Sequence, residues 1–187
     1  AFNEHLLFED TAATFFDADG DGDRDLYVGS GGNEAIERKE YRKDRLYFND
    51  GKGKFTYQGS SLPESYLNTS VVTAHDFDGD GDIDLFVGTR SVPGIYGINP
   101  DSFLLENGGN GNFKNVTEAK AFDLMKIGMI TDAAWADMTG DGIKDLVVVG
   151  DWMAPAVFEN SGKRLRLLKS NLDELTGLWN ALSVADL

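Results

Sequence analysis

The sequence predicts an all-β protein, a β-propeller fragment of about three four-stranded antiparallel blades plus the first strand of a fourth. Three observations carry this prediction. An Asp-rich segment recurs about every sixty residues, an Asn/Gly-type turn follows each copy, and short β-branched or aromatic runs flank both. A four-stranded unit of this size cannot bury both of its faces alone, and stacking such units radially gives a propeller.

The three Asp-rich segments align from their leading aspartates, Asp17, Asp76 and Asp137. They read FFDADGDGDRDLYVG at 15–29, HDFDGDGDIDLFVG at 75–88 and WADMTGDGIKDLVVVG at 135–150. Each follows a short apolar segment, so we expect each to join two strands. The later segments, RLYFNDGKGKF at 45–55, SFLLENGGNGNF at 102–113 and APAVFENSGKRL at 154–165, each predict a strand, a tight turn and a second strand.

These elements define a single partial propeller over residues 1–187. Blade one is expected at about 10–59, blade two at about 70–117 and blade three at about 129–169. The tail 178–187 resembles the strand before another loop, with Asp186 in the place of the leading aspartates. Because a propeller typically needs roughly four to eight blades, we expect the chain to be a fragment of a larger ring.

Each Asp-rich loop is predicted to bind a metal ion. Oxygen-bearing side chains stand at loop positions 1, 3, 5 and 9, glycine at position 6 permits a sharp turn, and position 7 is expected to offer its backbone carbonyl. The candidate ligands are Asp17, Asp19, Asp21, Asp23 and Asp25 in the first loop, Asp76, Asp78, Asp80, Asp82 and Asp84 in the second, and Asp137, Thr139, Asp141, Ile143 and Asp145 in the third.

Calcium is the predicted ion, with three sites. Hard oxygen ligands select a hard cation, and this many carboxylates favour calcium over magnesium, which keeps more of its water. Clustered carboxylates also need a counter-ion, since like charges oppose ionisation. The third site is expected to be the weakest, because Thr139 supplies a neutral oxygen and Lys144 adds a positive charge.

Two other interpretations of the loops compete with this one. An EF-hand needs a glutamate at position 12 and helices on both sides, whereas Val28, Val87 and Val148 stand there between strand-like runs. Simple acidic turns would also use Asp and Gly. The residues at position 12 and the strand-like flanks disfavour the EF-hand, and three aligned copies with oxygen at the same positions favour metal binding over simple turns.

Composition narrows the range of partners. The formal net charge of −15 predicts repulsion of nucleic acid and anionic membranes, and cations are the natural partners. Cysteine is absent, which excludes disulfides and thiol chemistry. No apolar run approaches the roughly 20 residues of a membrane helix, so no membrane insertion is expected. The two histidines, His5 and His75, lie in no catalytic motif, and His75 is expected to support the second loop from its strand.

The core DxDGDGxxDLxVG and the later NDGxGxF turn resemble the FG-GAP/VCBS repeat family, which includes the integrin-α-like β-propellers. Segments such as YRKDRLYFNDGKGKF and GMITDAAWADMTGDGIKDLVVVGDWM are most similar to bacterial surface or secreted proteins related to cartilage acidic protein, of the ASPIC/UnbV type. The resemblance implies a seven-bladed or similar propeller with calcium in the loop between the first two strands of each blade. Thr139 departs from the usual Asp or Asn.

Recognition is expected on the face opposite the metal loops. The connections on that face differ between blades, at 29–44, 88–102 and 150–155, and variable loops on a rigid scaffold usually carry binding. Tyr41, Tyr96 and Trp152 are candidate contact residues there, with core packing as the alternative. The alternating charges of the first connection predict a solvated loop or short helix: Glu34, Glu37, Arg38, Lys39, Glu40, Arg42 and Lys43.

Two functions follow from these expectations. The first is a calcium-binding module that mediates protein or glycan binding or adhesion, with calcium stabilising the blade hairpins and no catalytic residues. The second is the propeller scaffold of a calcium-dependent carbohydrate-active enzyme, a lyase or glycosidase. An extracellular, cell-surface or periplasmic location is expected, because calcium there is abundant enough to fill modest sites. The oligomeric state is left open.

Overall fold

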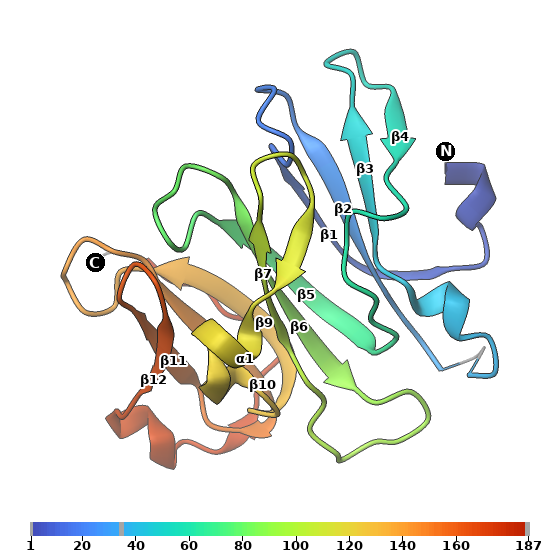
Figure 1. Cartoon of the computed structure of the whole chain (residues 1–187). Helices are drawn as coiled ribbons and strands as arrows, with labels where there is room; N and C mark the ends of the chain where they lie inside the picture. Colours follow the sequence, from blue (N-terminus) through green and yellow to red (C-terminus); the bar gives the residue numbers. More distant parts are fainter. Residues whose placement is uncertain (1, 34–35, 186–187) are drawn as a thin grey trace.

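A computed structural model describes residues 2–33 and 36–185, and nearly all of its regular structure is β (Figure 1). The first sheet holds β1 (Glu9–Phe16), β2 (Asp25–Gly31), β3 (Arg45–Asn49) and β4 (Phe55–Tyr57). The second holds β5 (Asn68–His75), β6 (Asp84–Ser91), β7 (Phe103–Asn107) and β8 (Phe113–Asn115). The third holds β9 (Met129–Ala136), β10 (Asp145–Met153), β11 (Ala156–Asn160), β12 (Leu165–Leu168) and β13 (Gly177–Leu178).

In residues 2–33 and 36–185, helical structure is limited to single turns. One α-helical turn, α1 (Thr117–Lys120), follows β8, and 3-10 turns lie at Phe2–His5, Lys39–Arg42, Phe122–Leu124 and Asn171–Glu174. No helix among the described residues is long and apolar enough to cross a membrane.

The sheets have the predicted topology. In each, the first four strands pair antiparallel with their neighbours in the chain, in the order β1-β2-β3-β4, β5-β6-β7-β8 and β9-β10-β11-β12. In the part of the chain that the structure describes, the sheets form no closed barrel. They stand side by side through their first strands, since β1 contacts β5 and β5 contacts β9. The expectation of an all-β propeller fragment is confirmed.

Two hydrophobic cores lie between the sheets. Alternate side chains of β6 enter different cores: Leu85 and Val87 pack with the first sheet, whereas Phe86 packs with the third. Both faces of the middle sheet are therefore covered. Each fully buried side chain of this kind contributes roughly 1.5–3 kcal/mol relative to exposure, so the interfaces between blades hold the fold together.

Hydroxyl groups join the first strands near the axis of the array. Thr11 Oγ1 donates to the carbonyl of Thr69 at 2.6 Å, and Ser70 Oγ donates to the carbonyl of Ile130 at 2.6 Å. Such close approach needs small neighbours. At Gly88, for example, an added Cβ would lie 2.7 Å from the Cγ2 of Ile130.

The tail continues this pattern. Thr131 Oγ1 donates to the carbonyl of Trp179, which thus takes the place that Thr69 and Ile130 hold in the preceding blades. The regular strand here is short, because only Gly177–Leu178 pairs with β10 and residues 179–185 form no strand. Asp186, the expected fourth leading aspartate, lies outside the described residues.

Candidate metal centres

The leading aspartate curls each loop. In the first loop the two oxygens of Asp17 accept the backbone N–H groups of Gly20, at 2.8 Å, and Gly22, at 3.0 Å. The other loops repeat this arrangement at Asp76 and Asp137. The glycine at position 6 is needed, since Gly22 has a φ of 93°, which side chains disfavour.

Two of the loops bring three carboxylates together. Oxygens of Asp17, Asp19 and Asp21 lie within 4.8 Å of one another, and so do oxygens of Asp76, Asp78 and Asp84. Calcium binds oxygen at roughly 2.3–2.6 Å, so oxygens at this spacing suit one shared ion. Within residues 2–33 and 36–185, the third loop forms no such group.

The aspartate at position 9 ties each loop to the second hairpin of its blade. Asp84 is fully buried; its Oδ2 accepts the N–H of Phe77 at 3.1 Å and its Oδ1 accepts the N–H of Asn107 at 2.8 Å. Asp25 and Asp145 make the corresponding pairs of bonds. This residue is therefore a structural link as well as a candidate ligand.

Burial makes the ionised form of several loop carboxylates unfavourable. Burial raises the pKa of Asp84 to about 7, and it also raises the pKa of Asp25. Burial and the neighbouring Asp21 raise the pKa values of Asp19 and Asp23. A bound cation would favour the ionised forms, so the loops have the electrostatics of a cation site.

The position-7 aspartates lie against the second hairpin. Asp23 faces Gly51, where an added Cβ would lie 3.1 Å from its Oδ2, and Asp82 faces Gly109, where the corresponding distance is 2.6 Å. Ile143 of the third loop is exposed. Among the remaining predicted ligands, the Oδ1 atoms of Asp21, Asp80 and Asp141 accept the N–H of the position-7 residue, at 2.8–3.0 Å; Thr139 is exposed.

Lys120 is a part of the second site that the sequence did not reveal. Its Nζ lies 2.8 Å from Asp78 Oδ2 and also pairs with Glu106. The other oxygen, Asp78 Oδ1, is buried with no hydrogen-bond partner in the described part of the chain. Lys120 thus fixes the Asp78 carboxylate while leaving one of its oxygens available to an ion.

Asparagine side chains connect the metal loops to the next blade. Asn107 Nδ2 donates to the carbonyl of Ala18 in the first loop at 2.8 Å, and Asn160 Nδ2 donates to the carbonyl of Phe77 in the second loop at 2.8 Å. The sequence showed these asparagines only as turn residues. Their repetition in NDG, ENG and ENS was the available signal.

The histidines play supporting parts. His75 is paired with Asp84 across β5 and β6, and its ring lies 5.1 Å from that of Trp135. Burial lowers its pKa. A ring nitrogen of His5 lies 2.8 Å from the hydroxyl of Tyr47.

A decline in stability with rising pH is expected for the calcium-free protein. Burial raises the pKa of Asp84 to about 7 and that of Asp44 to about 6, both from an ordinary value of 3.8. Between pH 3.8 and about pH 7 the folded state therefore holds more protons than the unfolded state, so the free energy of unfolding falls as the pH rises through that window. We expect a melting temperature several degrees lower at pH 8 than at pH 5, measured by circular dichroism in EGTA. Calcium should remove the part due to Asp84; a melting temperature that rises with pH would contradict this account.

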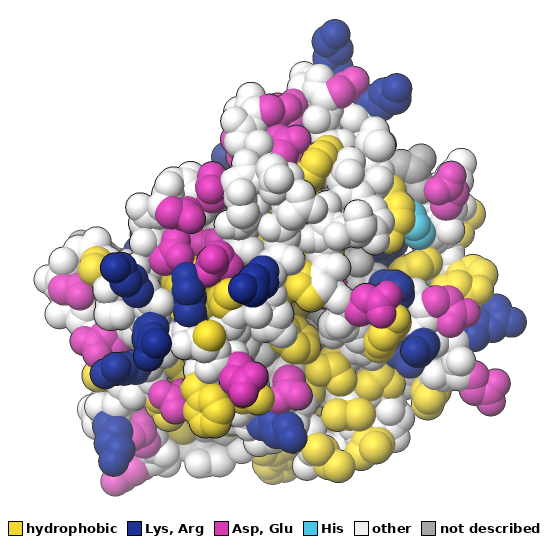
Figure 2. All heavy atoms as spheres, in the orientation of Figure 1, with side chains coloured by type: hydrophobic (Ala, Val, Ile, Leu, Met, Phe, Trp, Pro, Cys, Tyr) yellow, Lys and Arg dark blue, Asp and Glu magenta, His cyan; other side chains and the backbone are white. Residues whose placement is uncertain are grey.

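The two ends of the blades differ in surface chemistry. Figure 1 shows the three metal loops at one end of the sheets and the β2–β3 and β6–β7 connections at the other. In Figure 2 a group of Asp and Glu side chains covers the end with the loops, and further acidic side chains are scattered over the rest of this face; hydrophobic side chains gather over the lower right, at the β6–β7 connection.

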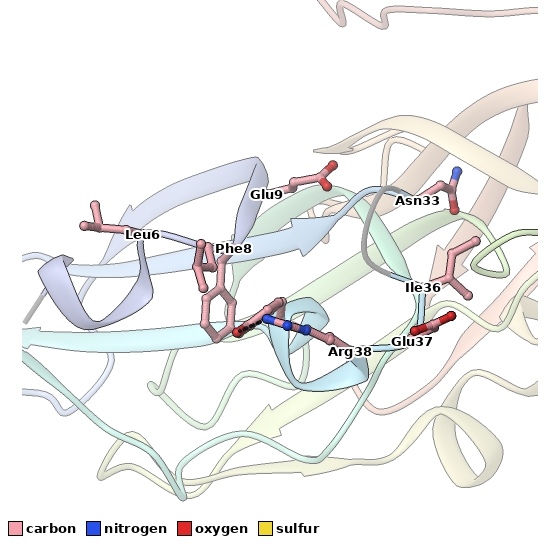
Figure 3. A pocket seen from close by; sticks show the side chains of 9 residues that line it. Leu6, Phe8, Glu9, Asn33, Ile36, Glu37 and Arg38 are labelled. Atoms are coloured by element: carbon pink, nitrogen blue, oxygen red, sulfur yellow. Dashed lines mark hydrogen bonds between the residues drawn. The ribbon is translucent and has the colours of Figure 1, made fainter.

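A hollow of about 720 Å³ lies beside the first sheet, lined by residues that include Leu6, Phe8 and Ile36 (Figure 3). Tyr41 lies here, where its hydroxyl accepts a hydrogen bond from Arg38 at 3.1 Å. Tyr41 thus contacts Arg38 and Phe8, whereas Tyr96 and Trp152 contact each other. Glu34, one of the predicted surface charges, lies outside the described residues.

The charged segment of the first connection is partly as expected. Lys39–Arg42 forms a short helical turn. Arg42, however, is buried rather than solvated, and its Nε donates to the carbonyl of Tyr66 at 3.2 Å. The expectation of solvation was wrong for this residue, because its long side chain turns inward to bond backbone carbonyls.

The chain was compared with known proteins. A family model described as an FG-GAP-like repeat matches residues 17–87, which run from the first metal loop to Val87, within β6. No curated protein matches the chain significantly. Residues 17–87 therefore carry an FG-GAP-like repeat, which supports the FG-GAP repeat family, and the third sheet extends the same β-propeller-type architecture.

Proposed function

We propose that this protein is a calcium-binding β-propeller module of an exported or cell-surface protein, which binds a protein or glycan partner. The observation that carries the proposal is the pair of carboxylate clusters, Asp17 with Asp19 and Asp21, and Asp76 with Asp78 and Asp84. Each lies in a loop whose curl is held by its own leading aspartate.

Calcium is favoured by the donor set. The candidate ligands are oxygens at high negative charge, and magnesium prefers one or two carboxylates with several waters. The unpartnered Oδ1 of Asp78 is the strongest single indication, since a buried carboxylate oxygen without a partner is costly. The second site would use this oxygen with Asp76 and Asp84. Extracellular calcium is abundant enough to fill such loops, which supports export.

Binding of a partner is proposed for the end opposite the loops. A metal ion in the loops would be too remote to touch this partner, so its role is to hold the hairpins and the blades that carry the variable connections. A binding role is preferred to catalysis because the carboxylate clusters lie in the metal loops, at the end opposite the variable connections.

Calcium titration by calorimetry tests this proposal. We expect two stronger sites and a third at least about tenfold weaker, because the third loop has Thr139 in place of one carboxylate and brings no three carboxylates together, a deficit of about 1.4 kcal/mol or more. Asp78→Asn should remove one stronger site, whereas Glu118→Gln, the loss of an exposed charge, should leave all sites unchanged.

Absence of calcium binding at millimolar concentration would refute the proposal. A third site as tight as the others would refute only the order of affinities. Equal affinity for magnesium would show that the loops select charge rather than calcium coordination.

A further inference from the structure

Side chains from two blades meet on the end opposite the metal loops. Trp152 Nε1 donates to the hydroxyl of Tyr96 at 3.2 Å, and this hydroxyl lies 3.4 Å from Asp151 Oδ2. Arg90 Nε donates to the same Oδ2 at 2.8 Å. Both aromatic residues are 64% exposed, while Asp151 is buried. Their orientation is thus fixed by hydrogen bonds although they face solvent.

Trp152 is held in a strained conformation. Its φ is 59°, in the left-handed region that bulky residues avoid. The register of β10 against β13 also shifts at this residue, between the pairs Asp151↔Leu178 and Met153↔Gly177. Strained, bulged residues that project a side chain are concentrated at binding sites, and packing does not explain an exposed ring.

A polar cavity of about 370 Å³ adjoins this cluster through Arg90. Its lining includes Thr11, Ser70 and Thr131 from the first strands, together with Asn68 and Ser91. Asn68 is 7% exposed, and its Nδ2 donates to Ser91 Oγ at 2.9 Å. Its Oδ1 is buried and has no hydrogen-bond partner among the described residues. The cavity is thus lined largely by amide and hydroxyl side chains, which can both donate and accept hydrogen bonds.

We propose that Tyr96 and Trp152, with the adjoining cavity, form a binding site for a neutral saccharide. A sugar ring offers an apolar C–H face to an aromatic ring and hydroxyl groups to the amide and hydroxyl side chains that line the cavity. A cavity of this volume falls in the usual range for small ligands. The inference rests on the proposed binding role and names its partner class.

The charges favour a neutral ligand. Arg90 is already paired with Asp151, so the site offers no uncompensated positive charge to an acidic glycan. The net charge of −15 adds repulsion. A peptide is disfavoured as well, because the donors of Trp152 and Tyr96 are used within the cluster and cannot bond peptide carbonyls.

Affinity electrophoresis of the full chain in native gels tests the proposal. The gels would contain mannan, dextran, laminarin or galactomannan as neutral probes, and dextran sulfate as the acidic one. We expect retardation by at least one neutral polysaccharide and none by dextran sulfate. Trp152→Gly should weaken the interaction by about tenfold or more while leaving the melting temperature unchanged or higher, since glycine relieves the left-handed strain.

Phe122→Ala is the matched control, because Phe122 is a similarly exposed aromatic elsewhere and its loss should leave retardation unchanged. Failure of every neutral probe to retard the protein would overturn the proposal, as would full retardation of Trp152→Gly. Release of new reducing ends from a retarding polysaccharide would overturn a role in binding alone. Calcium titration of the same sample shows whether the metal sites bind, so a failure of saccharide binding can be told apart from a failure of calcium binding.

Discussion

Chelation with excess EGTA is expected to lower the melting temperature by roughly 10–20 °C relative to the protein in millimolar calcium. A ligand at a hundred times its Kd stabilises the folded state by about 2.7 kcal/mol per site. Two such sites give about 5 kcal/mol, and each kcal/mol shifts the melting temperature of a domain this size by about 2–4 °C. Differential scanning calorimetry at fixed pH measures the shift.

The structure indicates where this loss of stability would act. Removing the ion restores repulsion between Asp76, Asp78 and Asp84, and the loop is joined to its own hairpin and to the next blade through Asn107 and Asn160. We therefore expect hydrogen exchange to rise first in the loops and then in β7 and β11. Readdition of calcium should reverse the change. A melting temperature that stays within a degree of the calcium value would contradict the account.

Much of the architecture could be predicted from the sequence because it is repeated. A single Asp/Gly-rich segment is an ordinary acidic turn, but three copies at a nearly constant step, each followed by an Asn/Gly-type hairpin, specify the order of strands in each sheet. The local rules for such turns do not depend on the rest of the fold. The position of the leading aspartates followed from the same alignment.

Contacts between segments far apart in the sequence, and the arrangement of side chains within each loop, could not be predicted in the same way. Lys120 reaches Asp78 from a helical turn 42 residues later, and nothing in the spacing of α1 marks it as part of a metal site. Trp152 and Tyr96 meet only because neighbouring blades place their connections side by side. The alignment also gave no warning that Asp76, Asp78 and Asp84 cluster in the second loop, whereas Asp17, Asp19 and Asp21 cluster in the first. Such differences depend on side-chain packing, which repeat patterns do not specify.

Asp84→Ala is expected to destabilise the calcium-free protein by roughly 2–4 kcal/mol. The substitution leaves the N–H groups of Phe77 and Asn107 without their acceptor in a buried position, and each unsatisfied buried group costs about 1–3 kcal/mol. Relief of the buried charge offsets part of this loss, since burial raises the pKa of Asp84 to about 7. Urea unfolding in EGTA at pH 7 gives the free energy directly.

Asp80→Ala provides the contrast, because Asp80 is exposed and its loop bond to Asp82 N–H is solvated. We expect it to cost below about 1 kcal/mol without calcium. Asp145→Ala should behave like Asp84→Ala, since Asp145 makes the same two bonds, to Met138 and Asn160, in a loop without a carboxylate cluster. Similar losses of stability at Asp84 and Asp145 would show that the position-9 aspartate stabilises the fold through its two hydrogen bonds, independently of metal binding. If Asp84→Ala instead costs no more than Asp80→Ala in EGTA, position 9 acts only as a metal ligand and the proposed link between the two hairpins is wrong.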